Sequence, residues 1–407
     1  MVASTPIMPE LRATPQQRRT ERLRFPRAKS YISELDIVRA VACASVVAVH
    51  VMGMVRGLDS ATGQTEVIGG IFSTLWHFTR ESFMMMTGLV LVYSYSREPF
   101  PIGRFFGRRT VERIIPYILW SMVYVLIYYP RRDTLGWWIH FGHDLLLGGA
   151  SYQLYAMSVN MQFYVVFPLL LWILTRLRSS HVPLLLISLA AQLFWYVDVA
   201  HLPPGQSPFP FITQNVIHFI FTYPFFFMVG AVWGMHVDEV RTFIDRHRRP
   251  VAALSVLTGL ILLGRYALIV IIQHRPTPIG ADVYEPAMVF WSLGAVALMW
   301  LWGRRLTGPL LSIPQRLTAF LAKSVSKASY GIFIVHVLFL RIFFADFATR
   351  IGGGAAIQFL VLWAMTFAAS FLLTRLLLAL PLLRLALGDV QWSRPHALSA
   401  PPPTLPG

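Results

Sequence analysis

Residues 34–55 read ELDIVRAVACASVVAVHVMGMV, an apolar segment that carries Arg39 near one end and His50 near the other. On a helix, eleven residues at 100° each place these two side chains within about 20° of the same face and about 16 Å apart. If the segment crosses a bilayer, each ionisable group costs about 2.5–3.5 kcal/mol. Two such groups on one face therefore indicate a functional site. The alternative is that Arg39 extends to the membrane interface and His50 makes a structural hydrogen bond.

The composition is typical of integral membrane proteins. Hydrophobic residues make up 56% of the 407 residues, charged residues make up 13%, and the mean hydropathy is +0.57. A soluble fold of this size cannot bury so much apolar surface. We therefore expect an all-α fold, a polytopic membrane helix bundle of about ten transmembrane helices, given about 20 apolar residues per crossing. The expected spans are 37–55, 71–95, 114–130, 155–175, 182–200, 215–236, 251–272, 285–303, 328–347 and 356–380.

The basic residues are distributed unevenly between the two sides of this bundle. The net charge of +16 would suggest nucleic-acid binding in a soluble chain, but the arginines and lysines gather between the apolar segments. With the amino terminus inside, 26 of the 35 lie in inner segments and 5 in outer segments. This positive-inside pattern predicts a multi-pass protein of the cell membrane, with both termini cytoplasmic. It also predicts contact with anionic membrane lipid and no nucleic-acid partner.

The composition divides the chain into three regions. Residues 1–30 are polar and basic without the apolar core of a signal peptide, and we expect a disordered cytoplasmic tail. Residues 31–385 hold all the expected spans, and residues 386–407 form a proline-rich cytoplasmic tail. The sequence has one cysteine, Cys43, inside the first span, so it has no disulfide framework and we expect a small core residue there.

The outer segment 131–154 contains WWIHFGHDLLLGG, which predicts a short amphipathic helix on the outer interface, anchored by Trp137 and Trp138. Its possible metal ligands are His140, His143 and Asp144. Because this pattern lacks a further ligand at metal-site spacing, we expect no metal site.

Polar side chains inside the spans are the first candidates for a functional site. Arg80 and Glu81 lie near the outer end of the second span. Because adjacent residues do not face each other on a helix, we expect each to find a partner on another helix. The fourth span carries Tyr155, Asn160 and Gln162 within otherwise apolar sequence. Such positions in a membrane helix usually face the bundle interior.

Two further motifs lie before the third span and inside the ninth. Residues 97–116, REPFPIGRFFGRRTVERIIP, form a basic inner loop whose arginines beside the third span are Arg104, Arg108, Arg109 and Arg113. Arginine forks suit phosphate, so this loop either holds a nucleotide-like donor or anchors the protein to lipid headgroups. In the ninth span, Ser329 and His336 are seven residues apart and share a face. His336 is either an interhelix hydrogen-bonding residue or a catalytic one.

Taken together, these motifs resemble the integral-membrane acyltransferase-3 family, which acylates sugars and polysaccharides. The stretches that carry the resemblance are ELDIVRAVACASVVAVH (34–50), SFMMMTGLVLVYS (82–94), FGRRTVERIIPYILW (106–120), LYAMSVNMQFYVVFPLL (154–170) and SKASYGIFIVHVLFL (326–340). The chain is most similar to the exopolysaccharide and biofilm intercellular-adhesin branch, whose fourth-span motif Tyr155 and Gln162 fit. It departs from many members at Asn160, where they place a glutamate.

The resemblance implies an O-acyltransferase that moves an acyl group, such as acetyl, from cytoplasmic acyl-CoA to a hydroxyl of an extracytoplasmic carbohydrate. Acyl-CoA is then a donor substrate, no cofactor is permanently bound, and a polysaccharide synthase complex is a further expected partner. The catalytic candidates are His50 as general base with Arg39, Tyr330 and His336. The donor-binding candidates are Arg108, Arg109 and Arg113. The substrate-binding candidates are Arg80, Glu81, Tyr155, Asn160 and Gln162.

Two other function classes stay open at this point. A transporter or polysaccharide exporter would use the same polar face for translocation. A structural subunit of a synthase complex would need the bundle to fold but would not depend on His50 or Arg39.

Overall fold

The computed structural model describes residues 31–58, 63–96, 100–129, 135–199, 201–203, 206, 210–308, 311–348 and 350–389. The expected tail 1–30, and the expected carboxy-terminal tail from residue 390 onward, lie outside these residues. Every helix described below belongs to the unit that begins at Ser33.

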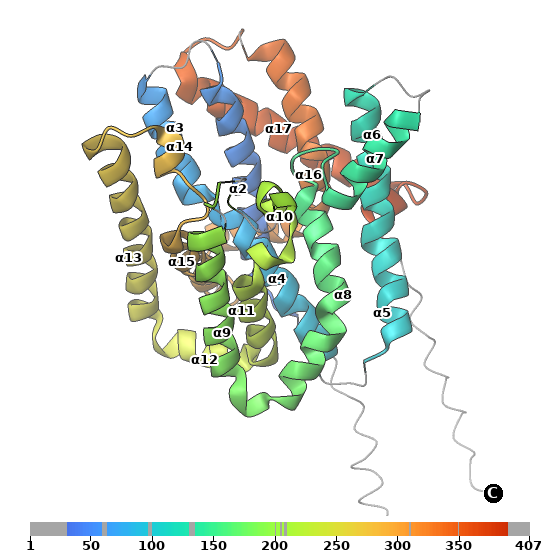
Figure 1. The fold of residues 1–407 in the computed structure, drawn as a ribbon, viewed down its shortest axis with the longest axis vertical. Coiled ribbons are helices and arrows are strands. Elements are labelled where there is room, and N and C mark those ends of the chain that lie inside the picture. The colour runs from blue at the N-terminus through green and yellow to red at the C-terminus, as the bar shows by residue number, and fades with distance from the viewer. Residues whose placement is uncertain are drawn as a thin grey trace, which may run out of the picture. The chain divides into compact units, whose positions relative to one another are not determined.

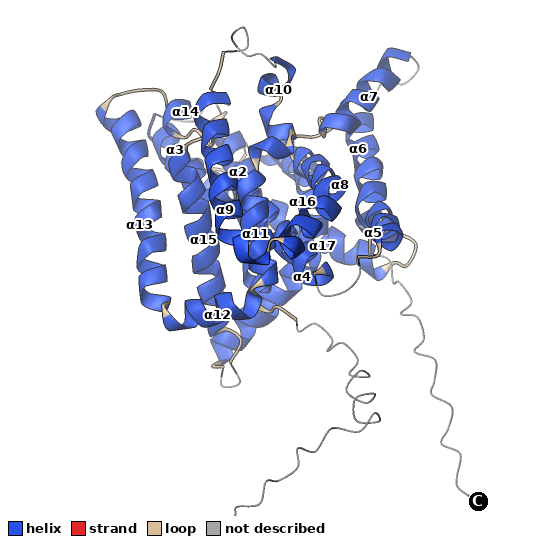
Figure 2. Cartoon of the chain, turned by 60° about the horizontal axis from the view of Figure 1, so that its bottom comes forward, coloured by secondary structure: helices blue, strands red, loops and turns tan. Residues whose placement is uncertain are grey.

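All regular elements in the described ranges are helices, as Figure 2 shows, and the expected all-α class is confirmed. The α-helices, labelled in Figure 1, are α2 (Glu34–Arg56), α3 (Gly63–Trp76), α4 (Phe78–Tyr95), α5 (Ile102–Arg109), α6 (Ile115–Tyr128), α7 (Leu135–Leu147), α8 (Tyr155–Arg176), α9 (His181–Phe194), α10 (Pro210–Gln214), α11 (Pro224–Met235), α12 (Val237–Arg246), α13 (Arg248–Ala267), α14 (Thr277–Gly280), α15 (Pro286–Arg305), α16 (Ile313–Phe347) and α17 (Gly354–Ala379). The π-helical segments are Thr110–Ile114, Trp195–Val199 and Leu268–Ile272, and the 3-10 turns are Arg178–Ser180, Val216–His218, Ile220–Thr222 and Arg384–Leu387.

Within the described part of the chain, eight helical segments are long and apolar enough to cross a membrane. They are Glu34–Arg56, Ile102–Tyr128, Tyr155–Arg176, Arg178–Val197, Arg248–Ile272, Pro286–Arg305, Ile313–Phe347 and Gly354–Ala379. Each corresponds to one of the expected spans. The protein is therefore a multi-pass membrane helix bundle.

The two remaining expected spans, 71–95 and 215–236, are built from shorter pieces. The first is divided at His77, where α3 ends and α4 begins. The second opens with two 3-10 turns before α11, which has 12 residues. These two interrupted segments meet in the bundle, since α4 packs directly against α11.

Glycines allow α4 and α11 to approach at backbone distance. A Cβ added to Gly88 would meet the backbone of Phe227, and one added to Gly230 would meet the carbonyl of Met85. Small residues at such crossings let the backbones of membrane helices pack closely. A methyl group at either glycine therefore has no room unless the helices separate.

We expect Gly230→Ala to destabilise the protein by about 1–3 kcal/mol, the usual cost of overpacking. The matched control is Gly264→Ala on α13, where no heavy atom lies within 4 Å of the added Cβ. In an open helical position alanine is favoured over glycine by about 0.5–1 kcal/mol, so the control should be neutral or stabilised. Thermal unfolding in detergent compares the two variants, and equal melting temperatures would contradict the close packing of α4 on α11.

Helix α2 occupies the centre of the bundle and packs against α3, α4, α15, α16 and α17. One face of α2 forms an apolar core with α16 and α17 that includes Cys43, Val47, Val51, Ile332 and Leu362. Cys43 is fully buried, which confirms the expected core role. This packing fixes the helix that carries both Arg39 and His50.

Two boundary predictions were wrong. The basic loop 97–116 is helical from Ile102 and runs through a π-helical segment into α6 without a break. The inner segment 303–327 is helical from Ile313, because Ser312 and Gln315 form a capping box that starts α16 fifteen residues before the expected span. In both cases the basic residues that suggested a loop lie on a helix that extends beyond its apolar part.

The amphipathic segment expected in 131–154 is helix α7, but only one of its two tryptophans is exposed. Trp138 is exposed, whereas Trp137 is buried and donates a hydrogen bond from Nε1 to the carbonyl of Tyr129 at 2.9 Å. Trp137 therefore joins α7 to the end of α6 and does not serve as a membrane anchor.

Candidate functional site

A cavity of about 190 Å³ lies between α2, α4, the α5–α6 segment, α8 and α16. Five of the sequence-predicted site residues line it: Arg39, Arg109, Arg113, Asn160 and Tyr330. They come from four segments that are far apart in the chain. The structure thus brings three arginines to one concave site inside a membrane bundle.

Aromatic rings hold two of these arginines in place. The Arg113 guanidinium lies 4.2 Å from the centre of the Tyr330 ring, and that of Arg109 lies 5.3 Å from the Tyr164 ring. The π-helical segment Thr110–Ile114 begins directly after Arg109 and contains Arg113, and it alters the helical phase at this point. π-Helical segments are frequent at functional sites.

Glu112 is the carboxylate next to these arginines, and it neutralises their charge only in part. Glu112 accepts from Arg108 at 2.6 Å and only weakly from Arg109, at 3.4 Å. Buried Arg109 Nε has no hydrogen-bond partner among the described residues. Arg108 does not line the cavity and its side chain is half exposed, so its position differs from the other two donor-binding candidates.

His50 and His336 form a hydrogen-bonded pair beside this cavity. His50 Nδ1 lies 2.7 Å from His336 Nε2, and the two ring planes are nearly parallel, at 8°, with their centres 5.0 Å apart. His336 Nδ1 lies 2.8 Å from the carbonyl of Phe333, which can only accept, so Nδ1 carries the proton. In the neutral ring His336 Nε2 then accepts from His50 Nδ1, and His50 Nε2 keeps a free lone pair.

The histidine pair does not line the cavity itself. Phe333 does line the cavity, and its ring centre lies 6.1 Å from that of His336. On another side, the exposed Tyr152 in the loop before α8 packs edge-on against His50 with the ring centres 4.7 Å apart. The histidine pair therefore has the cavity-lining Phe333 next to His336 and the exposed Tyr152 next to His50.

Arg80 and Glu81 each have a partner outside α4, since Glu81 Oε1 accepts from the Tyr196 hydroxyl at 3.4 Å. The expectation that these adjacent residues would not also meet each other was wrong. They bind each other, with Arg80 Nη2 2.6 Å from Glu81 Oε1, and both side chains are buried. Long side chains at the start of α4 reach each other despite being adjacent. The Arg80 guanidinium also stacks on Tyr223 and Tyr284 and donates to the carbonyl of Val283.

The polar residues of α8 have different surroundings. Asn160 donates to the carbonyl of Ala156, and its buried Oδ1 has no hydrogen-bond partner among the described residues. Gln162 binds the backbone of His218 and Ile220 and so fixes the turns that precede α11. Tyr155 packs edge-on against His218, 6.0 Å between ring centres. Of the three, only Asn160 lines the cavity.

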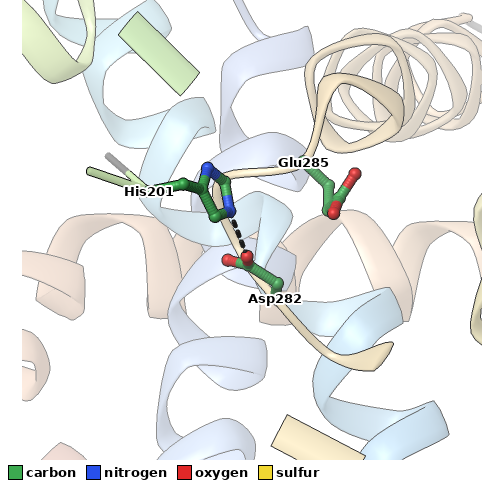
Figure 3. Close-up of side chains that lie close together, drawn as sticks. All are labelled: His201, Asp282 and Glu285. Atoms are coloured by element: carbon green, nitrogen blue, oxygen red, sulfur yellow. Dashed lines mark hydrogen bonds and ion pairs between the residues drawn. The ribbon is translucent and has the colours of Figure 1, made fainter. Parts of the chain in front are cut away.

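A separate cluster that the sequence did not indicate consists of His201, Asp282 and Glu285, shown in Figure 3. These residue types could hold a metal ion, but each already has a partner. His201 lies 2.6 Å from both the Tyr196 carbonyl and Asp282 Oδ2, and Glu285 is paired with Arg265. Burial lowers the pKa of His201, but the hydrogen bonds to Asp282 and Tyr196 outweigh it and leave the pKa above its ordinary value. The cluster therefore links residue 201 to the segment before α15.

The possible metal ligands of α7 are also paired with one another. Asp144 lies 3.4 Å from His140 Nε2 and 3.9 Å from His143 Nδ1. These separations are ordinary for weak ion pairs on a helix.

Sequence reasoning missed several residues that border the site: Tyr152, Tyr164 and Phe333. Each belongs to a motif quoted above or adjoins one. Their residue types are common in membrane helices, so no signal distinguished them from ordinary packing residues.

These features define a polytopic membrane protein with an arginine-lined cavity next to a hydrogen-bonded imidazole pair. A family model described as an acyltransferase domain matches residues 32–375, and the chain belongs to the acyltransferase-3 family. It is thus a membrane acyltransferase.

Curated relatives are distant. A probable poly-beta-1,6-N-acetyl-D-glucosamine export protein of Staphylococcus aureus strain MRSA252 is 24% identical over 259 residues, which cover 62% of this chain and 71% of that protein. The protein of the same name from strain N315 matches with the same identity and coverage. No solved structure matches the chain.

Proposed function

We propose that the protein transfers an acyl group, such as acetyl, from cytoplasmic acyl-CoA to a hydroxyl of an extracytoplasmic carbohydrate at the cell membrane. The observation that carries this proposal is the position of three arginines on one cavity that is also lined by Phe333, a neighbour of the His50–His336 pair. The amino and carboxyl termini then face the cytoplasm, in line with the positive-inside distribution of the sequence.

The donor would lie with its anionic nucleotide at the arginine end of the cavity. Charge-assisted hydrogen bonds from Arg39, Arg109 and Arg113 suit its phosphates. Arg39 and His50 are about 16 Å apart along α2, a length that the thin pantetheine arm can cover. The arm would pass Phe333 and bring the thioester next to His50.

His50 Nε2 would act as the general base. It removes the proton of the acceptor hydroxyl as the oxygen attacks the thioester carbonyl, so that a C–O bond forms and the C–S bond breaks. The proton on the imidazolium then passes to the departing CoA thiolate, which leaves as the thiol, and the ester remains on the carbohydrate. Asn160 cannot take the base role because an amide has no basic oxygen or nitrogen at neutral pH.

The name of these relatives favours a second function, polysaccharide export. A polymer needs a passage that is open along its length, whereas the arginine-lined cavity holds about 190 Å³. Its charge also suits a phosphorylated donor better than a neutral sugar chain. We therefore place acyl transfer first.

Transfer of label from radiolabelled acetyl-CoA to a carbohydrate acceptor, by the purified full-length chain in proteoliposomes, tests the proposal. Acyl transfer predicts label covalently attached to the carbohydrate and released by mild base. Movement of unlabelled carbohydrate across the membrane without any attached label would favour export instead.

We expect His336→Leu to lower the turnover rate by about 10- to 100-fold, the usual effect of losing a residue that orients a functional imidazole. His336→Gln should retain more activity, because the amide oxygen of glutamine can still accept from His50 Nδ1. Steady-state kinetics should show the loss in kcat while the donor KM is unchanged. An equal loss of kcat in both variants, together with a lower melting temperature, would indicate that His336 has a packing role alone.

A further inference from the structure

A second cavity, of about 550 Å³, lies where the end of α12 and the start of α13 meet the end of α15. Figure 1 shows α12 joining the start of α13 at the lower end of the bundle in that view. The charged residues that line the cavity are Asp245, Arg248, Arg249, Arg304 and Arg305. None of them belongs to the acyl-transfer site described above.

The charges of this cavity are not balanced. Asp245 is paired with Arg304, 2.5 Å between Oδ2 and Nη2, and Arg304 also contacts Glu34 Oε1 at 3.2 Å. Arg248, Arg249 and Arg305 form no ion pair within the described residues. Three like charges around one concavity repel each other unless an anion lies between them.

The surface next to the cavity is apolar. Along α13, immediately beyond the arginines, Leu254, Leu257 and Leu260 are each about half exposed or more, and Trp302 on α15 is 46% exposed. In a membrane helix such a surface faces the acyl chains, and tryptophan favours the headgroup region. The cavity therefore lies at the boundary between a cationic ring and a lipid-facing surface, which suits an amphiphile with an anionic head.

We propose that this cavity binds the phosphate headgroup of an anionic phospholipid, with the acyl chains along α13. Basic pockets between membrane helices are suited to such headgroups. Because Arg304 also binds Glu34, the first residue of α2, the lipid would support the end of the helix that carries Arg39 and His50. The proposal does not depend on the acyl donor or acceptor.

The full-length protein in neutral detergent, titrated with phosphatidylglycerol or phosphatidylcholine, tests this site through its melting temperature. The variant is Arg248→Gln, Arg249→Gln and Arg305→Gln combined. The matched control is Arg176→Gln, Arg178→Gln and Arg375→Gln, which removes the same charge from exposed arginines outside the cavity. Because all six arginines are exposed, both variants should fold. Arg305→Gln alone should show the same direction of change.

We expect phosphatidylglycerol, but not phosphatidylcholine, to raise the melting temperature of the wild type and of the control. The cavity variant should bind phosphatidylglycerol about a hundredfold more weakly, since each basic residue near an anionic surface contributes about fivefold. Equal stabilisation of the two triple variants would overturn the proposal. Stabilisation by inorganic phosphate or free coenzyme A, lost in the cavity variant while phosphatidylglycerol has no effect, would assign the cavity to a soluble phosphate compound and would also overturn it.

Discussion

His50→Ala should lower acyl transfer from acetyl-CoA to carbohydrate by about 100- to 10,000-fold, the usual contribution of a positioned general base. Donor binding should change little, because the arginines that would hold the phosphates line a cavity that His50 does not enter. The measurement is label transfer in proteoliposomes, together with equilibrium binding of acetyl-CoA.

The matched control is His247→Ala, which removes a side chain that hydrogen-bonds to the Phe243 carbonyl and lies outside the cavity. It should retain full activity. Undiminished transfer by the His50 variant would remove this residue from the reaction. Loss of both transfer and donor binding would indicate that the bundle had not folded correctly.

Arg109→Gln and Arg113→Gln should each raise the donor Kd by about 10- to 100-fold, because a hydrogen bond to a charged group contributes about 1.5–3 kcal/mol. Arg113→Lys should bind the donor little better than Arg113→Gln does. Lysine lacks the planar guanidinium that stacks on the Tyr330 ring at 4.2 Å. Isothermal titration with coenzyme A, which carries the same phosphates as the acylated donor, gives the Kd directly.

The control for these arginines is Arg104→Gln on the same helix, which is exposed and does not line the cavity. Its donor Kd should stay within twofold of the wild type, within the scatter expected of a surface change. Equal weakening by all three substitutions would mean that the basic helix attracts the donor only through its net charge.

The spacing of Arg39 and His50 on one helix face could be predicted from the sequence, because both lie within an uninterrupted apolar segment. The eight long spans were predictable for the same reason. The pairing of His50 with His336 was not, since it depends on how α2 packs against α16, and periodicity within one segment says nothing of its neighbour. The same packing makes Phe333 and Tyr152 neighbours of the pair, which the sequence could not predict.

The errors at helix boundaries have a common physical origin. Hydropathy marks where a helix is apolar, whereas hydrogen bonds and caps decide where it begins. α16 therefore starts at its capping box on Ser312, well before the apolar part, and α5 extends the third span into a basic segment. At α4 and α11 the opposite holds, because His77 and the turns before Pro224 end regular helix inside apolar sequence.

Sidedness of transfer tests the central claim most directly, namely that the donor enters at the arginine-lined cavity and its acyl group reaches His50 from there. Radiolabelled acetyl-CoA is trapped inside proteoliposomes of known protein orientation, with the carbohydrate outside. We expect labelled carbohydrate outside only from protein whose proposed cytoplasmic side, with both termini, faces the lumen. His50→Ala should give no transfer. Label that appears only when donor and acceptor share one compartment would contradict the claim.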